Sequence, residues 1–237
     1  MSTFAFGQEE LIAGKTTEQI IKEYKSWSRM KNDWANLARY QQENEALASR
    51  EVGDTRVVFM GNSITQNWVS QRPEFFLENN YLGRGISGQT TPQMVLRFRQ
   101  DVIDLNPDMV VILAGTNDIA GNTGPTTQEM ITDNIFNMVN LAQANEIKVI
   151  LCSVLPANAY FWNPDLKPAD RIIDLNARLK AFAEDNNIPY VDYFSAMVDG
   201  EKGLKKEYGK DGVHPNLAGY AVMEPMIKEA IEKELGR

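Results

Sequence analysis

Short apolar runs alternate with segments of helical length along most of this chain. The runs are nearly continuous in Val, Ile and Leu, as expected for parallel strands that are covered on both faces. They predict strands at 56–60, 81–86, 109–114, 148–154 and 189–193. Between and after them the helical spacing of apolar positions predicts helices at 92–105, 127–144, 168–186 and 216–235. This alternation implies right-handed crossovers and a doubly wound three-layer α/β/α sandwich on a parallel five-stranded sheet.

The first fifty residues have a different pattern, rich in helix over residues 17–48. Trp27, Trp34, Leu37 and Tyr40 are spaced by 7, 3 and 3, which predicts one apolar face that packs on the domain or on a second subunit. The chain has no internal repeat, low-complexity tract or linker rich in Pro, Gly and Ser. We therefore expect one domain: a helical extension at 1–50 packed on a core at 51–237.

Composition places the chain among ordinary globular proteins, with 43% hydrophobic and 24% charged residues. The net charge of −8 argues against binding to nucleic acid or to anionic lipid, which needs clustered positive charge. A single cysteine, Cys152, excludes an intrachain disulfide and leaves no cysteine framework for a structural metal. It lies in an apolar run, which favours a buried packing role.

Membrane insertion is not expected, because no stretch approaches the roughly 18 apolar residues that span a bilayer. The N-terminus also lacks the basic and apolar regions of a secretory signal, which predicts a cytoplasmic protein. A secreted or periplasmic chain whose signal had been removed would look the same.

Candidate chemistry lies where the strands end, since ligands of open parallel sheets bind beyond the carboxyl ends of the strands. Ser63 follows the first predicted strand and would open a helix. The chain has one histidine, His214, so any imidazole chemistry depends on it, and Asp211 three residues earlier could orient its ring. A serine becomes a good nucleophile only when a base takes its proton, and His214 could fill that role. Ser63 could instead be a helix N-cap, and Asp211 and His214 could be polar loop residues before a helix capped by Asn216.

Other acids and donors have more than one interpretation. Asp118 would brace the turn of Asn117, Asp192 is an alternative acid, and Asp108 lies at the wrong end of its strand. Gly88 could offer a backbone N–H, and Asn117 a side-chain N–H, to the oxyanion that forms in acyl transfer. Equally, Gly88 could only satisfy a turn of positive φ and Asn117 could only close an Asx-turn.

The loop after the fourth predicted strand contains three consecutive aromatic residues, Tyr160, Phe161 and Trp162. They could wall the site and bind substrate, with Trp162 stacked on a sugar ring. They could equally pack on the sheet.

Taken together, four ordered segments resemble the signature blocks of the SGNH or GDSL-type serine hydrolases. These are Gly61-Asn62-Ser63, the glycine block 85–91, Gly115-Thr116-Asn117-Asp118, and Asp211 with His214, and the similarity covers residues 57–226. The resemblance implies a flavodoxin-like fold of strand order 2-1-3-4-5, with no metal and no organic cofactor. It implies Ser63 as nucleophile, His214 as base, Asp211 as its orienting acid, and an oxyanion hole formed by Ser63, Gly88 and Asn117.

One position departs from the family pattern, because Asn62 stands where the family usually has aspartate. That aspartate is not the triad acid, so catalysis should survive the change. The expected substrate is a short-chain ester, acetyl first, carried by a small molecule or a carbohydrate. Alternatives are a lipase, thioesterase or peptidase with the same triad, a flavodoxin-like protein that binds an anion or nucleotide, and an inactive scaffold that binds through its N-terminal helices.

Overall fold

The computed structural model describes residues 14–48 and 55–236, and the chain divides into two compact units, Met1–Arg39 and Tyr40–Arg237. In its described part the first unit contains helix α2 (Thr17–Asn32) and the 3₁₀ helix η1 (Leu37–Arg39).

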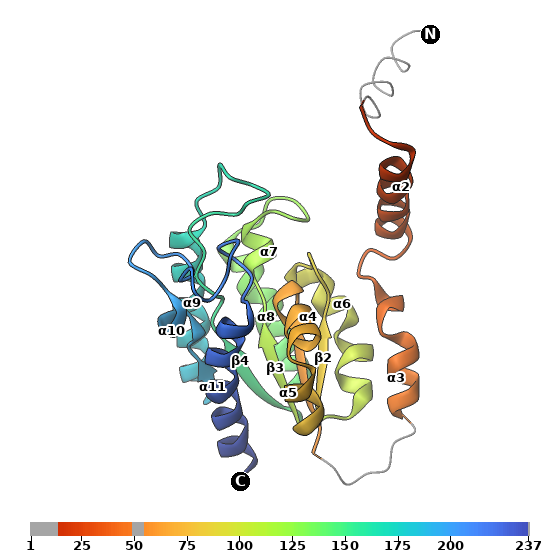
Figure 1. The fold of residues 1–237 in the computed structure, drawn as a ribbon. Helices are drawn as coiled ribbons and strands as arrows, with labels where there is room; N and C mark the ends of the chain where they lie inside the picture. Colours follow the sequence, from red (N-terminus) through yellow and green to blue (C-terminus); the bar gives the residue numbers. More distant parts are fainter. Residues whose placement is uncertain (1–13, 49–54, 237) are drawn as a thin grey trace. The chain divides into compact units, whose positions relative to one another are not determined.

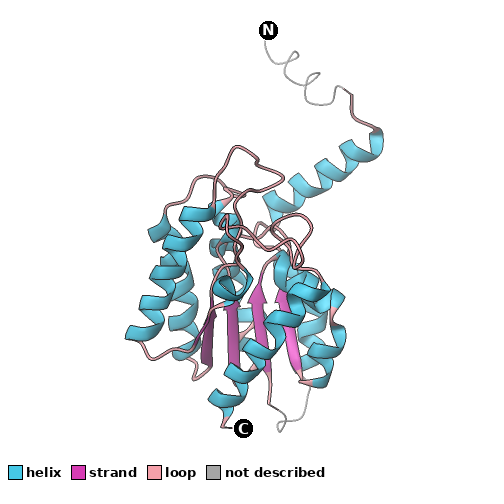
Figure 2. Cartoon of the chain, turned by 60° about the vertical axis from the view of Figure 1, so that its left-hand side comes forward, coloured by secondary structure: helices cyan, strands magenta, loops and turns pink. Residues whose placement is uncertain are grey.

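A five-stranded parallel sheet forms the centre of the second unit (Figures 1 and 2). Its strands are β1 (Val57–Gly61), β2 (Tyr81–Gly85), β3 (Met109–Leu113), β4 (Lys148–Cys152) and β5 (Tyr190–Val191). Their order in the sheet is β2-β1-β3-β4-β5, and every neighbouring pair is parallel. The predicted three-layer sandwich and the strand order 2-1-3-4-5 are confirmed.

Helices cover both faces of this sheet, as Figure 2 shows. They are α3 (Gln41–Ala48), α4 (Ser63–Gln71), α5 (Pro73–Glu78), α6 (Thr91–Asp101), η2 (Ile103–Leu105), α7 (Thr116–Ile119), α8 (Gln128–Gln143), α9 (Ala169–Asp185), α10 (Tyr193–Met197) and α11 (Leu217–Leu235).

The core consists of two hydrophobic clusters, one on each face of the sheet. Val58, Met60 and Ile112 face the side covered by α6, α8 and α9. Their neighbours Phe59 and Val111 face the side covered by α4, α5, α10 and α11. Alternate residues of each strand are therefore buried on opposite faces, which explains why the strands are apolar at almost every position.

Strand register brings the carboxyl ends of three strands to one level. Gly61 of β1 pairs with Gly85 of β2 on one side and with Leu113 of β3 on the other. The chain order reverses around β1, so this edge is the topological switch point where open α/β sheets bind ligands. The segments that follow these three residues all emerge there.

Several predicted boundaries differ from the structure for local reasons. Strand β5 stops after two residues because Asp192 caps helix α10, accepting a hydrogen bond from the N–H of Ser195. The helix predicted at 92–105 breaks at Val102, and the left-handed Asn106 ends the 3₁₀ turn that follows. The sequence pattern does not predict the short helices α5, α7 and α10.

The apolar face predicted over Trp27, Trp34, Leu37 and Tyr40 is wrong as a single helix face. Helix α2 ends at Asn32, and the carboxylate of Asp33 accepts hydrogen bonds from the N–H groups of Leu37 and Ala38. Asn36 adopts a left-handed φ of 55°, so the helix does not continue through this turn. Tyr40 belongs to the second unit, where it is buried. The expected packing of residues 1–50 as one extension stays a prediction, and residues 1–13 and 49–50 lie outside the described residues.

Two further expectations concern burial and membranes. Cys152 is buried, as predicted, and burial raises the pKa of its thiol to about 12, which keeps it protonated and unreactive. Over residues 14–48 and 55–236, the structure contains no helix with the length and apolar character that crossing a bilayer requires.

Candidate active site

Ser63 lies on a tight turn between β1 and α4 and is the first residue of that helix. Asn62 caps the helix, because its side-chain oxygen accepts a hydrogen bond of 3.1 Å from the N–H of Ile64. As the first helical residue, Ser63 has a backbone N–H with no acceptor inside the helix. The residue retains 7% exposure, so its hydroxyl lies in a nearly closed position.

The turn is packed against the end of β2 with no room for extra atoms. A Cβ added at Gly85 would come within 2.3 Å of the backbone nitrogen of Gln66 and 2.7 Å of the carbonyl oxygen of Asn62. A glycine is therefore required at this position if α4 is to start so close to the strand.

His214 meets Ser63 from a loop 151 residues further along the chain. The Ser63 Oγ and His214 Nε2 atoms are 2.9 Å apart, within hydrogen-bond distance. On the other side of the ring, His214 Nδ1 lies 2.7 Å from Asp211 Oδ2. A carboxylate can only accept, so Nδ1 carries the proton and Nε2 accepts from the serine hydroxyl. Ser63, His214 and Asp211, which the sequence singled out, are brought together.

Asp211 also folds the loop that carries the histidine. Its Oδ1 atom accepts hydrogen bonds from the N–H groups of Val213, at 2.9 Å, and His214, at 2.8 Å. Burial alone would raise the pKa of Asp211, but the hydrogen bonds from His214 and Val213 outweigh it and hold the pKa below its usual value. The carboxylate is thus kept charged beside the imidazole.

Gly88 and Asn117 come from neighbouring loops beyond β2 and β3. The Asn117 side chain donates a hydrogen bond of 2.9 Å to the carbonyl of Gln89, and that of Asn122 donates one of 3.1 Å to the carbonyl of Gly88. Gly88 has a φ of 78°, the left-handed conformation that glycine adopts without strain. Its own N–H has no acceptor within the described parts of the chain. Both donors thus belong to one cross-linked pair of loops at the carboxyl edge.

Asp118 is fully buried behind these loops and connects them to α6. Its carboxylate accepts hydrogen bonds from the N–H of Thr91, at 2.9 Å, and from the hydroxyl of Thr91, at 2.6 Å. Burial raises the pKa of Asp118 to about 6, although the Thr91 hydrogen bonds and the charge of Arg171 lower it. The expected bracing of the Asn117 turn thus runs through the first residue of the neighbouring helix.

The other two alternative acids are engaged elsewhere. Asp108 accepts a hydrogen bond from the N–H of Arg56 at the amino end of the sheet. Asp192 caps α10 through the N–H and hydroxyl of Ser195. Among the acids considered from the sequence, Asp211 is the one whose carboxylate contacts the imidazole.

The three aromatic residues of the β4–α9 loop divide into two kinds. Tyr160 is fully buried and its hydroxyl lies 2.9 Å from that of Thr116, so its ring supports the loop. Of the two interpretations of Tyr160, the structure favours packing over contact with a substrate. Trp162 stacks on Tyr160 with a centroid distance of 4.8 Å and stays 38% exposed, and Phe161 is 64% exposed. Both exposed rings lie 6.4 Å from the His214 ring, centroid to centroid. The two rings, 4.7 Å apart from centroid to centroid, thus lie together beside the histidine.

Chemically, this arrangement can move a proton from a serine hydroxyl to an imidazole while backbone and amide donors lie on adjacent loops. Within residues 14–48 and 55–236, no group of three or more His, Cys, Asp and Glu side chains is placed to hold a metal ion. Sequence reasoning missed the part played by Gln89, whose backbone carbonyl anchors Asn117; a glutamine in a loop carries no signal of this role.

The parallel sheet and the loops that carry Ser63, Gly88, Asn117 and His214 are consistent with one class of protein. The chain matches the GDSL-like lipase/acylhydrolase family over residues 51–222, and it belongs to that family. It is therefore a carboxylic ester hydrolase, and the sequence alternatives of an anion or nucleotide binder and of an inactive scaffold are set aside.

Two Bacteroides proteins of known crystal structure are similar over most of the chain. One, from Bacteroides fragilis, is 56% identical, has a TM-score of 0.84, and covers 86% of this chain and 99% of its own. The other, a GDSL-like lipase from Bacteroides thetaiotaomicron, is 53% identical with a TM-score of 0.84, covering 85% of this chain and 100% of its own. An acetylxylan esterase from Geobacillus stearothermophilus is 27% identical over 160 residues, which are 65% of this chain and 71% of that enzyme.

Proposed function

We propose that the protein is a serine esterase that removes short acyl groups, acetyl first, from carbohydrate or similar alcohols. The observation that carries the proposal is the 2.9 Å approach of Ser63 Oγ to His214 Nε2, with Asp211 on the opposite ring nitrogen. A hydroxyl is a weak nucleophile without such a base, and this contact provides one.

In the proposed reaction Ser63 Oγ attacks the ester carbonyl carbon as His214 Nε2 takes the hydroxyl proton. The imidazolium that forms is stabilised by the carboxylate of Asp211. The bond between carbonyl carbon and leaving oxygen then breaks, and His214 returns the proton to the departing alcohol. A water molecule then attacks the acyl-enzyme carbonyl and gives a proton to His214. The bond between the carbonyl carbon and Ser63 Oγ breaks, His214 returns the proton to Ser63 Oγ, and the carboxylic acid leaves.

Three donors are assigned to the negative oxygen of the tetrahedral intermediate: the N–H groups of Ser63 and Gly88, and the Asn117 side-chain amide. The Gly88 N–H has no competing acceptor in the described chain, and Asn117 uses one of its two amide hydrogens on Gln89. Donors fixed in advance stabilise the transition state more than the substrate, which is what accelerates the reaction.

The substrate proposal has two supports. Exposed Trp162 and Phe161 lie beside His214, and aromatic faces suit sugar rings. The Geobacillus relative is an acetylxylan esterase. No nucleic acid, membrane, metal or cofactor has a part in the reaction as we propose it.

The first experiment measures hydrolysis of p-nitrophenyl acetate by the wild type and by Ser63→Ala. Loss of turnover in the variant, with unchanged circular dichroism, is expected; unchanged turnover would refute the assignment of the nucleophile. A profile across acyl lengths and acetylated sugars then tests the substrate. A steep preference for decanoyl over acetyl esters would favour the lipase alternative.

The part of Trp162 is tested by replacing it with alanine. The variant should have a raised KM for acetylated xylo-oligosaccharides, with ethyl acetate, which has no ring to stack, hydrolysed at the wild-type rate. Leu77→Ala, which removes an exposed apolar side chain on α5, away from the histidine loop, is the control. An unchanged KM for the sugar substrate in Trp162→Ala would contradict the stacking role.

A further inference from the structure

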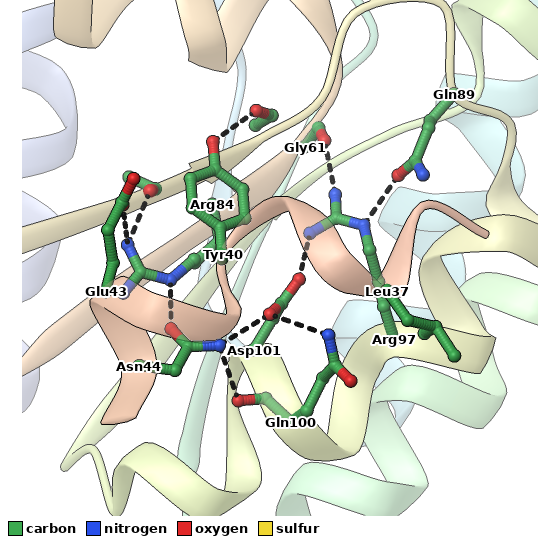
Figure 3. A network of polar contacts seen from close by, with 12 residues as sticks. Leu37, Tyr40, Glu43, Asn44, Gly61, Arg84, Gln89, Arg97, Gln100 and Asp101 are labelled. Carbon is green, nitrogen blue, oxygen red and sulfur yellow. Dashed lines mark hydrogen bonds and ion pairs between the residues drawn. The ribbon is translucent and has the colours of Figure 1, made fainter. Parts of the chain in front are cut away.

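A fully buried arginine lies behind the candidate active site. Arg97 is on helix α6, and its guanidinium donates three hydrogen bonds, shown in Figure 3. The Nε atom donates to the Gln89 side-chain oxygen at 2.6 Å, and the two terminal nitrogens donate to the Gly61 carbonyl at 2.9 Å and to Asp101 Oδ2 at 2.9 Å. One planar group thus joins the end of β1, the β2–α6 loop and its own helix.

The two acceptors outside α6, Gly61 and Gln89, adjoin proposed catalytic groups. Gly61 lies two residues before Ser63, and its carbonyl also accepts the N–H of Ile86 at 3.2 Å. Gln89 follows Gly88, and its backbone carbonyl accepts the Asn117 amide. Moving the guanidinium would therefore disturb the nucleophile turn and the glycine loop at once.

Burying this charge is costly, which argues that it has a specific role. Burial lowers the pKa of Arg97, and the adjacent charge of Asp101 opposes that effect. A buried ion pair often adds no stability over apolar side chains of similar volume, and its fixed geometry is the property that such side chains cannot supply.

Helix α3, which lies before the family-matched residues 51–222, extends the network to the surface. The Asn44 amide donates to Asp101 Oδ1 at 2.7 Å and to the Gln100 carbonyl at 3.0 Å (Figure 3). The oxygen of that amide accepts from Arg84 Nε at 3.0 Å. Close by, the Tyr40 hydroxyl donates to the Gly85 carbonyl at 2.5 Å.

From this geometry we propose that Arg97 is a positioning residue, which fixes the spacing between the Ser63 turn and the Gly88–Asn117 donors. Asn44 of α3 holds Asp101 in place, and Asp101 in turn orients the Arg97 guanidinium. The inference rests on the proposed function, since it assigns the network to acyl transfer. Misplacing reacting groups by about 1 Å can cost about 10²-fold in rate, so the effect should appear in kcat.

The test compares Arg97→Met with Arg99→Met, which changes an exposed arginine on the same helix. Active sites are titrated with a fluorophosphonate, and kcat and KM for p-nitrophenyl acetate are measured per titrated site. We expect Arg97→Met to lose about 10²-fold in kcat with KM nearly unchanged, Arg97→Lys to recover part of the loss, and Arg99→Met to match the wild type. A folded Arg97→Met with wild-type kcat per site would overturn the inference.

A second pair of variants decides the matter if Arg97→Met does not fold. Asn44→Ala should lower kcat several-fold at constant KM, whereas Gln41→Ala, at an exposed position on α3, should not. Equal kcat in this pair would overturn the inference. Ser63→Ala is assayed alongside: if it retains turnover, the proposed function fails and the inference with it, whereas an inactive Ser63→Ala beside an active Arg97→Met overturns the inference alone.

Discussion

Replacing Asp211 by asparagine tests the orientation of the histidine while leaving its loop intact. The asparagine oxygen can keep the hydrogen bonds that Asp211 Oδ1 accepts from the N–H groups of Val213 and His214. Its amide nitrogen then stands in place of Oδ2, 2.7 Å from His214 Nδ1. An amide N–H in that place has to donate, which moves the imidazole proton to Nε2, and the ring can no longer accept a proton from Ser63.

The amide could turn over to restore the acceptor at Nδ1, but its N–H₂ group would then face two backbone N–H donors. Losing those two hydrogen bonds costs about 1 kcal/mol or more each, which keeps the flipped form a minor species. With the wrong tautomer dominant, kcat should fall by between about 10² and about 10⁴, or about 3 to 5 kcal/mol of transition-state stabilisation.

The assay is steady-state hydrolysis of p-nitrophenyl acetate, with Asp192→Asn as the matched control. Asp192 caps α10 and does not contact the histidine, so that variant should retain the wild-type kcat. A kcat for Asp211→Asn within about tenfold of the wild type would refute the reasoning from the tautomer.

Three further predictions follow from the same structure. Asn117→Ala should lower kcat by about 10²–10³ with little change in KM, measured on p-nitrophenyl acetate; an equal rise in KM with kcat unchanged would speak against an oxyanion donor. The folded pKa of Asp118, about 6, lies above the ordinary 3.8, so its stabilising contribution is complete below pH 3.8 and lost as the pH rises through 6. Between about pH 4 and 7, the free energy of unfolding of Asp118→Asn should therefore rise by about 3 kcal/mol relative to that of the wild type, as measured by urea unfolding. A difference that does not depend on pH would contradict this. Gly85→Ala should reduce the free energy of unfolding by about 2 kcal/mol or more because its Cβ would meet the backbone at Gln66, whereas Gly200→Ala, which meets nothing, should change it little; equal losses in urea unfolding would be evidence against the close packing.

The sheet could be predicted from the sequence because its strands are buried on both faces. Val57–Gly61 and Met109–Leu113 have no exposed position, so they appear as continuous apolar runs with polar residues where they end. The same regularity predicts Ser63 and Asn117 as site candidates, since ligands of such sheets bind at the carboxyl edge, whereas His214 is a candidate because it is the one histidine of the sequence. Strand β5 was overestimated because a capping aspartate interrupts it.

Short elements gave no usable pattern. Helices α5 and α10 have six and five residues, too few for helical periodicity to show. Helix α2 ends at Asn32 because the Asp33 side chain accepts backbone hydrogen bonds and Asn36 adopts a left-handed conformation. The spacing of aromatic residues does not reveal these local interactions. The spacing of apolar residues therefore predicts a single helix face across the turn that in fact follows Asn32.

The polar network behind the site was also invisible in the sequence. Arg97 and Asp101 are four residues apart on a helix, a spacing that usually indicates an ion pair on a solvated surface. In the structure both are buried: Asp101 accepts a hydrogen bond from Asn44 of α3, and Arg97 donates to the β2–α6 loop and to the end of β1. The buried position of Tyr160, next to the exposed Phe161 and Trp162, is likewise stabilised by its hydrogen bond to a distant Thr116.

The central claim, that Ser63 becomes acylated during turnover, can be measured directly. The protein is mixed with p-nitrophenyl acetate, quenched in acid within the burst, digested and analysed by mass spectrometry, with Ser63→Ala treated in parallel. We expect one added acetyl group on the peptide that contains Ser63 and none on the variant. Turnover with an acetyl group on another residue, or on none at any quench time, would contradict it.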